Sequence, residues 1–233
     1  MLSQPVADSD RLLVVPALYI ADDVLLQRLV DYARQGGHLL LTFRSGYADE
    51  YGRMRPTRAP GILREAIGAS YQEYSNLVTR LGLKSTDSGL TFGSDAYAQG
   101  WADGLQIEGA TPLAYYVHPH FGKFPAIISQ PYGQGRVTYC GTLPNRALGK
   151  ALARWTMQQA QVAPVGEDLP ESVRLILGHS KDGQRLAFYT NWSWEQQTIS
   201  KLPFTGKELF SGVQAASLNL NAWDVQIVAE DRV

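Results

Sequence analysis

The sequence is poor in cysteine: Cys140 is the only one among 233 residues, so one chain cannot form an internal disulfide. Proteins of oxidising compartments often carry paired cysteines, whereas a lone thiol is typical of a reducing compartment. The first ten residues, MLSQPVADSD, also lack the basic and apolar segments of a secretory signal. Both absences predict a cytoplasmic protein.

Long apolar runs and basic clusters are missing as well. Apolar runs such as residues 12–15 and 39–41 are far shorter than the roughly 20 residues of a membrane-spanning helix. The 21 lysines and arginines are offset by 22 acids, which leaves a net charge of -1 and no basic run. Because nucleic-acid-binding domains carry a basic face, we expect neither nucleic acid nor a membrane as a partner.

The strongest pattern that is present lies in residues 11–43 and predicts two strands joined by a helix. Residues 12–15 form a continuous apolar run, as expected of a strand buried on both faces in a parallel sheet. Asp22 can cap a helix whose apolar residues recur at helical spacing, and Gly36 with Gly37 can end it. A second strand is expected over 38–43. This βαβ unit makes the first half of the chain an α/β domain.

The rest of the first half is less regular. A short helix is expected over 60–67, strands over 114–117, 126–130 and 136–140, and a last helix after Asn145. Residues 70–100 show no clear period, and the fragments 81–83 and 90–92 are interpreted as edge strands.

A change in composition predicts a domain boundary near residue 163. Residues 161–170 form an acidic connector that contains proline and glycine. Beyond it the pattern alternates without a helical period, and Asp182-Gly183 is suited to a tight hairpin turn. We therefore predict an α/β domain over 1–163 and a small β-sandwich-like domain over 164–233.

No catalytic residue can be assigned from the sequence. A glycosidase needs two facing carboxylates, and the 22 acids here fall in turns, helix starts and connectors. A (β/α)₈ barrel that could hold such a pair takes about 250 residues. Cys140, in the segment VTYCGT, matches part of a nucleophile elbow, which leaves an amidotransferase-like enzyme as one alternative. The other interpretation of Cys140 is a buried strand residue.

Metal and cofactor sites are not expected. His118 and His120 place two imidazoles in one loop, but a metal needs three or four ligands and the spacing offers no third. Gly133 and Gly135 lead into a strand, whereas a dinucleotide-binding loop leads from a strand into a helix.

Two places are candidates for ligand binding. Arg44 and Ser45 follow the second predicted strand, at the end of a parallel sheet where α/β folds commonly bind ligands; a subunit or interdomain contact is the other interpretation. Trp192 and Trp194 fall on one face if their segment is extended, so they could stack on sugar rings. Alternatively, Trp192 fills the small β core or the domain joint.

Residues 14–50, VVPALYIADDVLLQRLVDYARQGGHLLLTFRSGYADE, resemble the β-galactosidase trimerisation domain of glycoside hydrolase family 42. The shared pattern is a strand ending in PALY, a D-x-x-L-x-x-x-L helix, a GG-x-L-L-x-T strand and the loop R-S-G-x-x-D-E. Residues 60–64, 124–126 and 132–142 resemble later parts of that domain, and the segment from Ser172 onward is similar to the family's small C-terminal β domain.

The resemblance implies a flavodoxin-like or class I amidotransferase-like fold for the first domain, without the amidotransferase cysteine. It also implies a homotrimer that supports a catalytic barrel, which in this family lies before the segment and carries both glutamates. That barrel would be in cis in the parent enzyme or on another chain, so these residues alone are not expected to catalyse hydrolysis. A carbohydrate-binding module that uses Trp192 and Trp194, or the Arg44 loop, remains an alternative.

Overall fold

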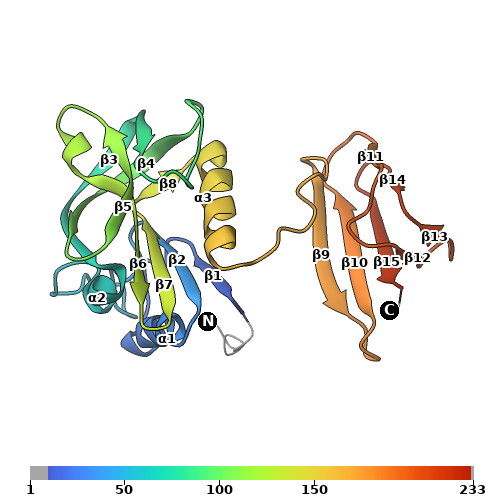
Figure 1. The fold of residues 1–233 in the computed structure, drawn as a ribbon, viewed down its shortest axis with the longest axis horizontal. Coiled ribbons are helices and arrows are strands. Elements are labelled where there is room, and N and C mark those ends of the chain that lie inside the picture. The colour runs from blue at the N-terminus through green and yellow to red at the C-terminus, as the bar shows by residue number, and fades with distance from the viewer. Residues whose placement is uncertain (1–9, 232–233) are drawn as a thin grey trace. The chain divides into compact units, whose positions relative to one another are not determined.

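A computed structural model describes residues 10–231 of the chain (Figure 1). The backbone forms two compact units, one ending at Ala163 and the other starting at Pro164. The first unit combines helices with one large sheet, whereas the second consists of strands and turns in its described part. In the described part of the chain, no helix is both long enough and apolar enough to cross a membrane.

The first unit begins with the predicted βαβ arrangement. Strand β1 (Leu12–Val15) and strand β2 (His38–Thr42) pair in parallel, and helix α1 (Asp23–Arg34) connects them. The Asp22 carboxylate accepts a hydrogen bond of 2.6 Å from the Leu25 amide, as expected of an N-cap. Gly36, with φ of 123°, takes the left-handed turn that separates the helix from β2. The sequence prediction for this segment is confirmed.

Eight strands form the sheet of the first unit, in the order β1-β2-β7-β6-β5-β3-β4-β8. Only β1, β2 and β7 are parallel, and the other neighbours pair antiparallel. The remaining elements are η1 (Gly61–Leu63), α2 (Arg64–Ile67), β3 (Ala69–Ser85), β4 (Tyr97–Ile107), β5 (Thr111–Val117), η2 (Phe121–Lys123), β6 (Pro125–Tyr132), β7 (Gly135–Cys140), β8 (Thr142–Pro144) and α3 (Arg146–Gln159). The fold is therefore mixed α/β and mostly sheet.

The interpretation of residues 70–100 was wrong. Residues 81–83 do not form an edge strand, because they belong to β3, which lies between β5 and β4. Residues 90–92 form no strand, and Leu90 is buried in the loop between β3 and β4. Much of the 17-residue β3 is exposed. A strand with so little burial carries only a weak apolar alternation, which is why its length escaped prediction.

Two apolar cores cover the two faces of this sheet. Leu39 and Leu41 of β2 pack into the core that contains the buried side of α1. Leu40, which points to the other face, packs into the core that contains Leu152 and Trp155 of α3. The parallel part of the sheet thus has a helix on each face (Figure 1). Continuous apolar runs in β1 and β2 follow from this burial on both sides.

The second unit contains a five-stranded antiparallel sheet with the order β13-β12-β15-β10-β9 and a separate pair, β11-β14. Tyr189, Leu220 and Val228 are fully buried in its core. The bounds are β9 (Val173–His179), β10 (Arg185–Asn191), β11 (Gln197–Ile199), β12 (Gly206–Glu208), β13 (Gln214–Ala215), β14 (Leu218–Leu220) and β15 (Val225–Glu230). Asp182-Gly183 lies in the turn between β9 and β10, where a hairpin turn is predicted.

Candidate functional site

The predicted ligand residues Arg44 and Ser45 form the turn that follows β2. Arg44 has a φ of 60°, in the left-handed region that costs energy for a residue with a side chain. Ser45 is fully buried, and its hydroxyl donates a hydrogen bond of 2.7 Å to the Thr42 carbonyl. The structure therefore shows Ser45 closing the turn, with its hydroxyl turned to the backbone.

The Arg44 side chain lies between aromatic rings. The guanidinium carbon is 4.3 Å from the ring centre of Tyr19 and 4.6 Å from that of Trp101. Tyr74 stacks on the outer side of this group, with its ring centre 4.6 Å from Trp101. Contacts between a guanidinium and the faces of aromatic rings are attractive, so they fix the position of the side chain. Arg44 joins β2, the β1–α1 connection and β4 into one cluster.

A buried acid, Asp103 of β4, lies beneath this cluster and was not among the residues singled out from the sequence. Its carboxylate accepts hydrogen bonds of 2.7 Å from Trp101 Nε1 and 2.8 Å from the Tyr139 hydroxyl. Burial raises the pKa of Asp103 to about 7, while the bonds from Trp101 and Tyr139, the Arg44 backbone and the Arg44 charge oppose that rise. In the sequence, the contact between Trp101 and Asp103 is indicated only by the spacing Trp-x-Asp.

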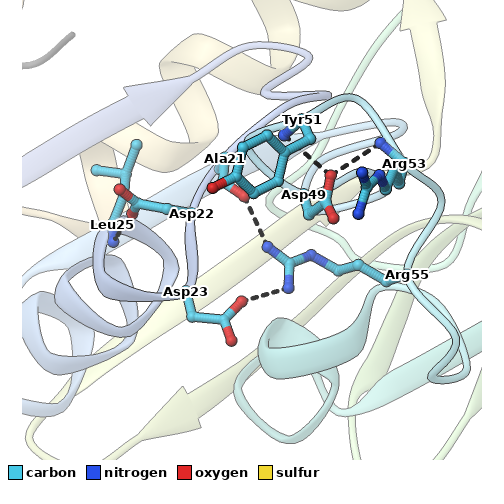
Figure 2. Close-up of polar contacts among 8 residues, drawn as sticks. All are labelled: Ala21, Asp22, Asp23, Leu25, Asp49, Tyr51, Arg53 and Arg55. Atoms are coloured by element: carbon cyan, nitrogen blue, oxygen red, sulfur yellow. Dashed lines mark hydrogen bonds and ion pairs between the residues drawn. The ribbon is translucent and has the colours of Figure 1, made fainter.

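The loop from residue 44 to residue 60 is held firmly against the start of α1. Asp49 accepts hydrogen bonds from the amides of Tyr51, at 3.0 Å, and Arg53, at 2.8 Å (Figure 2). Arg55 forms an ion pair with Asp23 and donates a bond of 2.6 Å to the Ala21 carbonyl. These bonds close the loop on itself and attach it to α1, so the loop has a defined shape.

Exposed apolar side chains gather on this loop and on the residues before and within the first turn of α1. Tyr51 is 74% exposed and Met54 is 68% exposed, and more than half of Ile20 and of Val24 is exposed. The segments are adjacent, because Ala48 bridges both Ile20 and Met54 in β-bridges. We call the surface of Ile20, Val24, Tyr51 and Met54 the loop face. Grouped apolar exposure of this kind marks interaction surfaces.

A pocket of about 270 Å³ adjoins the loop face at Met54. Its lining combines the rings of Tyr47 and Tyr74 with the cationic side chains of Arg55 and Arg58. Arg58 donates a hydrogen bond to Gln106. The pocket is large enough for one side chain of a partner, and Arg58 favours an acidic one.

The second predicted ligand site, Trp192 and Trp194, lies on the surface of the second unit. Trp192 is 63% exposed and Trp194 is 83% exposed. Trp192 does not fill the core of this unit, which Tyr189 and Leu220 occupy. A third indole, Trp223, lies between them in ring contact with both.

The remaining sequence candidates have structural roles. Cys140 is fully buried in β7, and burial raises the pKa of its thiol to about 12, so the reactive thiolate is absent at neutral pH. The imidazole of His118 accepts bonds from the amides of His120, at 3.2 Å, and Phe121, at 3.0 Å. In the part of the chain that the structure describes, no group of three or more potential metal ligands occurs.

Comparison with known proteins identifies the family of this chain. The sequence model of the "Beta-galactosidase trimerisation domain" of glycoside hydrolase family 42 matches residues 7–163. The chain belongs to this family. The resemblance carried by residues 14–50 is confirmed, and within residues 10–231 no (β/α)₈ barrel is present.

Relatives of the trimerisation-domain chain are β-galactosidases. It is 34% identical to beta-galactosidase Bga of Halorubrum lacusprofundi over 170 residues, which cover 70% of the chain and 24% of the relative. It is 31% identical to BgaH of Haloferax lucentense over 193 residues, which cover 83% of the chain and 28% of the relative. The chain thus spans only about a quarter of the length of these curated relatives.

Solved structures show the same fold. The β-galactosidase of Bacillus circulans sp. alkalophilus matches with a TM-score of 0.83 and 22% identity, over 95% of this chain and 33% of that one. The enzyme of Halorubrum lacusprofundi matches with a TM-score of 0.75 and 27% identity, over 98% of this chain and 33% of that one. The described fold is therefore that of the trimerisation region of these enzymes.

Proposed function

We propose that this chain is the oligomerisation part of a cytoplasmic β-galactosidase and that it forms a homotrimer. The family match over residues 7–163 carries the proposal. The reacting carboxylates would lie on a catalytic barrel, either in cis in the parent enzyme or on another chain. The work of these residues is then to fix the positions of neighbouring subunits, and no cofactor or metal is needed for it.

We assign the subunit contact to the loop face. Tyr51 and Met54 expose large apolar areas, and the bonds of Asp49 and Arg55 hold them in place before a partner arrives. A preordered surface loses little conformational entropy on association, which strengthens binding. In this proposal Arg44 and its aromatic neighbours stabilise the loop, so Arg44 supports the subunit contact indirectly.

A cyclic trimer requires a heterologous interface, in which two different patches of one chain meet. The loop face and the adjoining arginine-lined pocket are chemically different, one apolar and one cationic. They would form the centre and the rim of one of these patches, and the second patch would be a different surface of the neighbouring chain. An acidic side chain of the neighbouring subunit would suit Arg58, since Arg55 is already paired with Asp23.

We further propose that the first unit is related to class I amidotransferase-like and flavodoxin-like domains. The parallel strands β1, β2 and β7 with a helix on each face support this relationship. The five antiparallel strands of the sheet distinguish the first unit from those domains. Cys140, buried and without a thiolate, argues against retained amidotransferase chemistry.

Replacing both Tyr51 and Met54 by alanine is expected to weaken self-association at least tenfold. Truncating a hot-spot residue at the centre of an interface costs about 2 kcal/mol or more, and 1.4 kcal/mol is tenfold in affinity. Equilibrium sedimentation of the variant and the unchanged chain would measure the loss. Because both side chains are exposed, the fold itself should be unaffected.

Val78→Ala is the matched control, because Val78 is 99% exposed and apolar but lies in β3, outside the loop face. It should leave self-association within about twofold of the unchanged chain. If both variants associated as strongly as the unchanged chain, the loop face would not be the contact. If Val78→Ala alone weakened association, the contact would lie on β3.

A further inference from the structure

Three indoles form a single exposed surface on the second unit, at the ends of two loops. Trp192 and Trp194 follow β10, and Trp223 lies between β14 and β15. The ring centres of Trp192 and Trp223 are 6.0 Å apart, and those of Trp194 and Trp223 are 5.4 Å apart. We call this surface the indole platform. The loop face belongs to the first unit, and the indole platform belongs to the second.

The indole platform is held rigid by a buried amide. Asn191 is buried, and its side-chain nitrogen donates bonds of 2.7 Å to the Glu195 carbonyl and 2.8 Å to the Asn221 carbonyl. Its side-chain oxygen accepts a bond of 2.8 Å from the Ser193 hydroxyl. One amide therefore joins both loops that carry the indoles. Each buried bond of this kind fixes geometry, because leaving it unmade would be costly.

The backbone at Trp223 is strained. Its φ is 57°, in the left-handed region that bulky residues rarely adopt. The Trp223 amide still donates a bond of 3.2 Å to the Ser193 carbonyl. Strain of this kind persists where the surroundings enforce it and is concentrated at ligand sites. Here it places an indole that is 49% exposed between two others, although burial does not require it.

The exposed area suits a small ligand. From the exposed fractions of the three side chains, 63%, 83% and 49%, the indoles present roughly 300–500 Å² in all. The ring centres also lie too close together to enclose a quaternary ammonium group, which an aromatic cage would surround.

We propose that the indole platform binds neutral pyranosides. One face of a galactopyranose ring presents only C–H groups, which suit an indole face, while its hydroxyls point outward. Exposed Glu195 and Gln196, next to Trp194 in the chain, offer oxygen and amide partners for those hydroxyls. The sequence singled out Trp192 and Trp194; Trp223 completes the site from 29 residues further along the chain than Trp194.

The test is ligand-observed saturation-transfer NMR with methyl β-galactopyranoside, using sorbitol as a polyol without a ring face. The full chain should transfer saturation to the galactoside, most strongly to its C–H face, with a dissociation constant of about 1–10 mM. Trp194→Ala should lower the transfer at least fivefold. Phe210→Ala, which removes another exposed aromatic ring of the second unit, should leave it unchanged.

Three results would overturn the proposal. The galactoside signal could match that of sorbitol, or Trp194→Ala could bind as well as the unchanged chain. Thirdly, Trp194→Ala could alter the sedimentation of the chain, which would make the indole platform a protein contact. Loss of self-association in the loop-face variants would leave the sugar signal intact, so the two proposals fail separately.

Discussion

Replacing Gly135 by alanine is expected to destabilise the first unit by about 3 kcal/mol or more, a larger effect than most single substitutions have. A Cβ atom at this position would lie 2.2 Å from the Gly37 carbonyl oxygen and 2.4 Å from that of Ala33. Both are backbone atoms at the end of α1, where the chain turns into β2. They cannot move aside as a flexible side chain would.

The surrounding hydrogen bonds make this clash hard to relieve. The Gln134 amide donates a bond of 2.9 Å to the Arg34 carbonyl, and the Arg136 amide donates one of 3.1 Å to the Gly37 carbonyl. Moving β7 away from α1 would break both bonds and disturb the parallel pairing with β2. The glycine is therefore needed because helix and strand backbones meet here without a side chain between them.

Urea unfolding with hydrogen exchange of the β2 and β7 amides would measure this effect in the first unit. Gly149→Ala is the control, because a Cβ at this position in α3 meets nothing within 4 Å. Alanine should stabilise that helix by up to about 1 kcal/mol. A Gly135→Ala chain within about 0.5 kcal/mol of the original would contradict the close approach described here.

Asp103→Asn is expected to remove a pH-dependent destabilisation of up to about 4 kcal/mol. The pKa of Asp103 is about 7 in the folded chain and 3.8 in its ordinary state. The folded chain therefore binds this proton more tightly than the unfolded chain does. The contribution of Asp103 to stability is complete below about pH 4 and is lost as the pH rises through about 7.

Stability must be compared with that of the Asp103→Asn variant because the titration of His38 changes stability with pH in the opposite direction. Burial, with the charge of Arg136, lowers the pKa of His38 from 6.5 to about 4, so its contribution is present above pH 6.5 and is lost on acidification. Both chains share His38, so its contribution cancels in the difference. Urea unfolding from pH 4 to 8 should show the unchanged chain losing stability relative to Asp103→Asn. Parallel profiles of stability against pH for the two chains would contradict a raised pKa of the buried Asp103.

Local signals in the sequence account for what could be predicted. Asp22 and Gly36 mark the ends of α1 through contacts within a few residues, and both act as expected. Trp192 and Trp194 were singled out because residues two apart in an extended segment share a face, but in the structure they lie in the bend that follows β10. Features that depend on neighbours in the chain are visible to this kind of reasoning.

Features that depend on distant segments were missed. Arg44 packs against Trp101 and the pair Asp103–Tyr139 is buried, but 57 and 36 residues separate the partners. No periodic pattern links positions so far apart. Trp223 joins the indole platform in the same way. The length of β3 was missed for a different reason, since a largely exposed strand shows little apolar alternation.

We infer that this chain brings copies of itself together. Sedimentation equilibrium of the unchanged chain, whose mass is 25.7 kDa, tests it most directly. We predict a concentration-dependent approach to three times that mass, because the family to which the chain belongs is a trimerisation domain. A mass that remains at 25.7 kDa at every concentration tested would contradict the account.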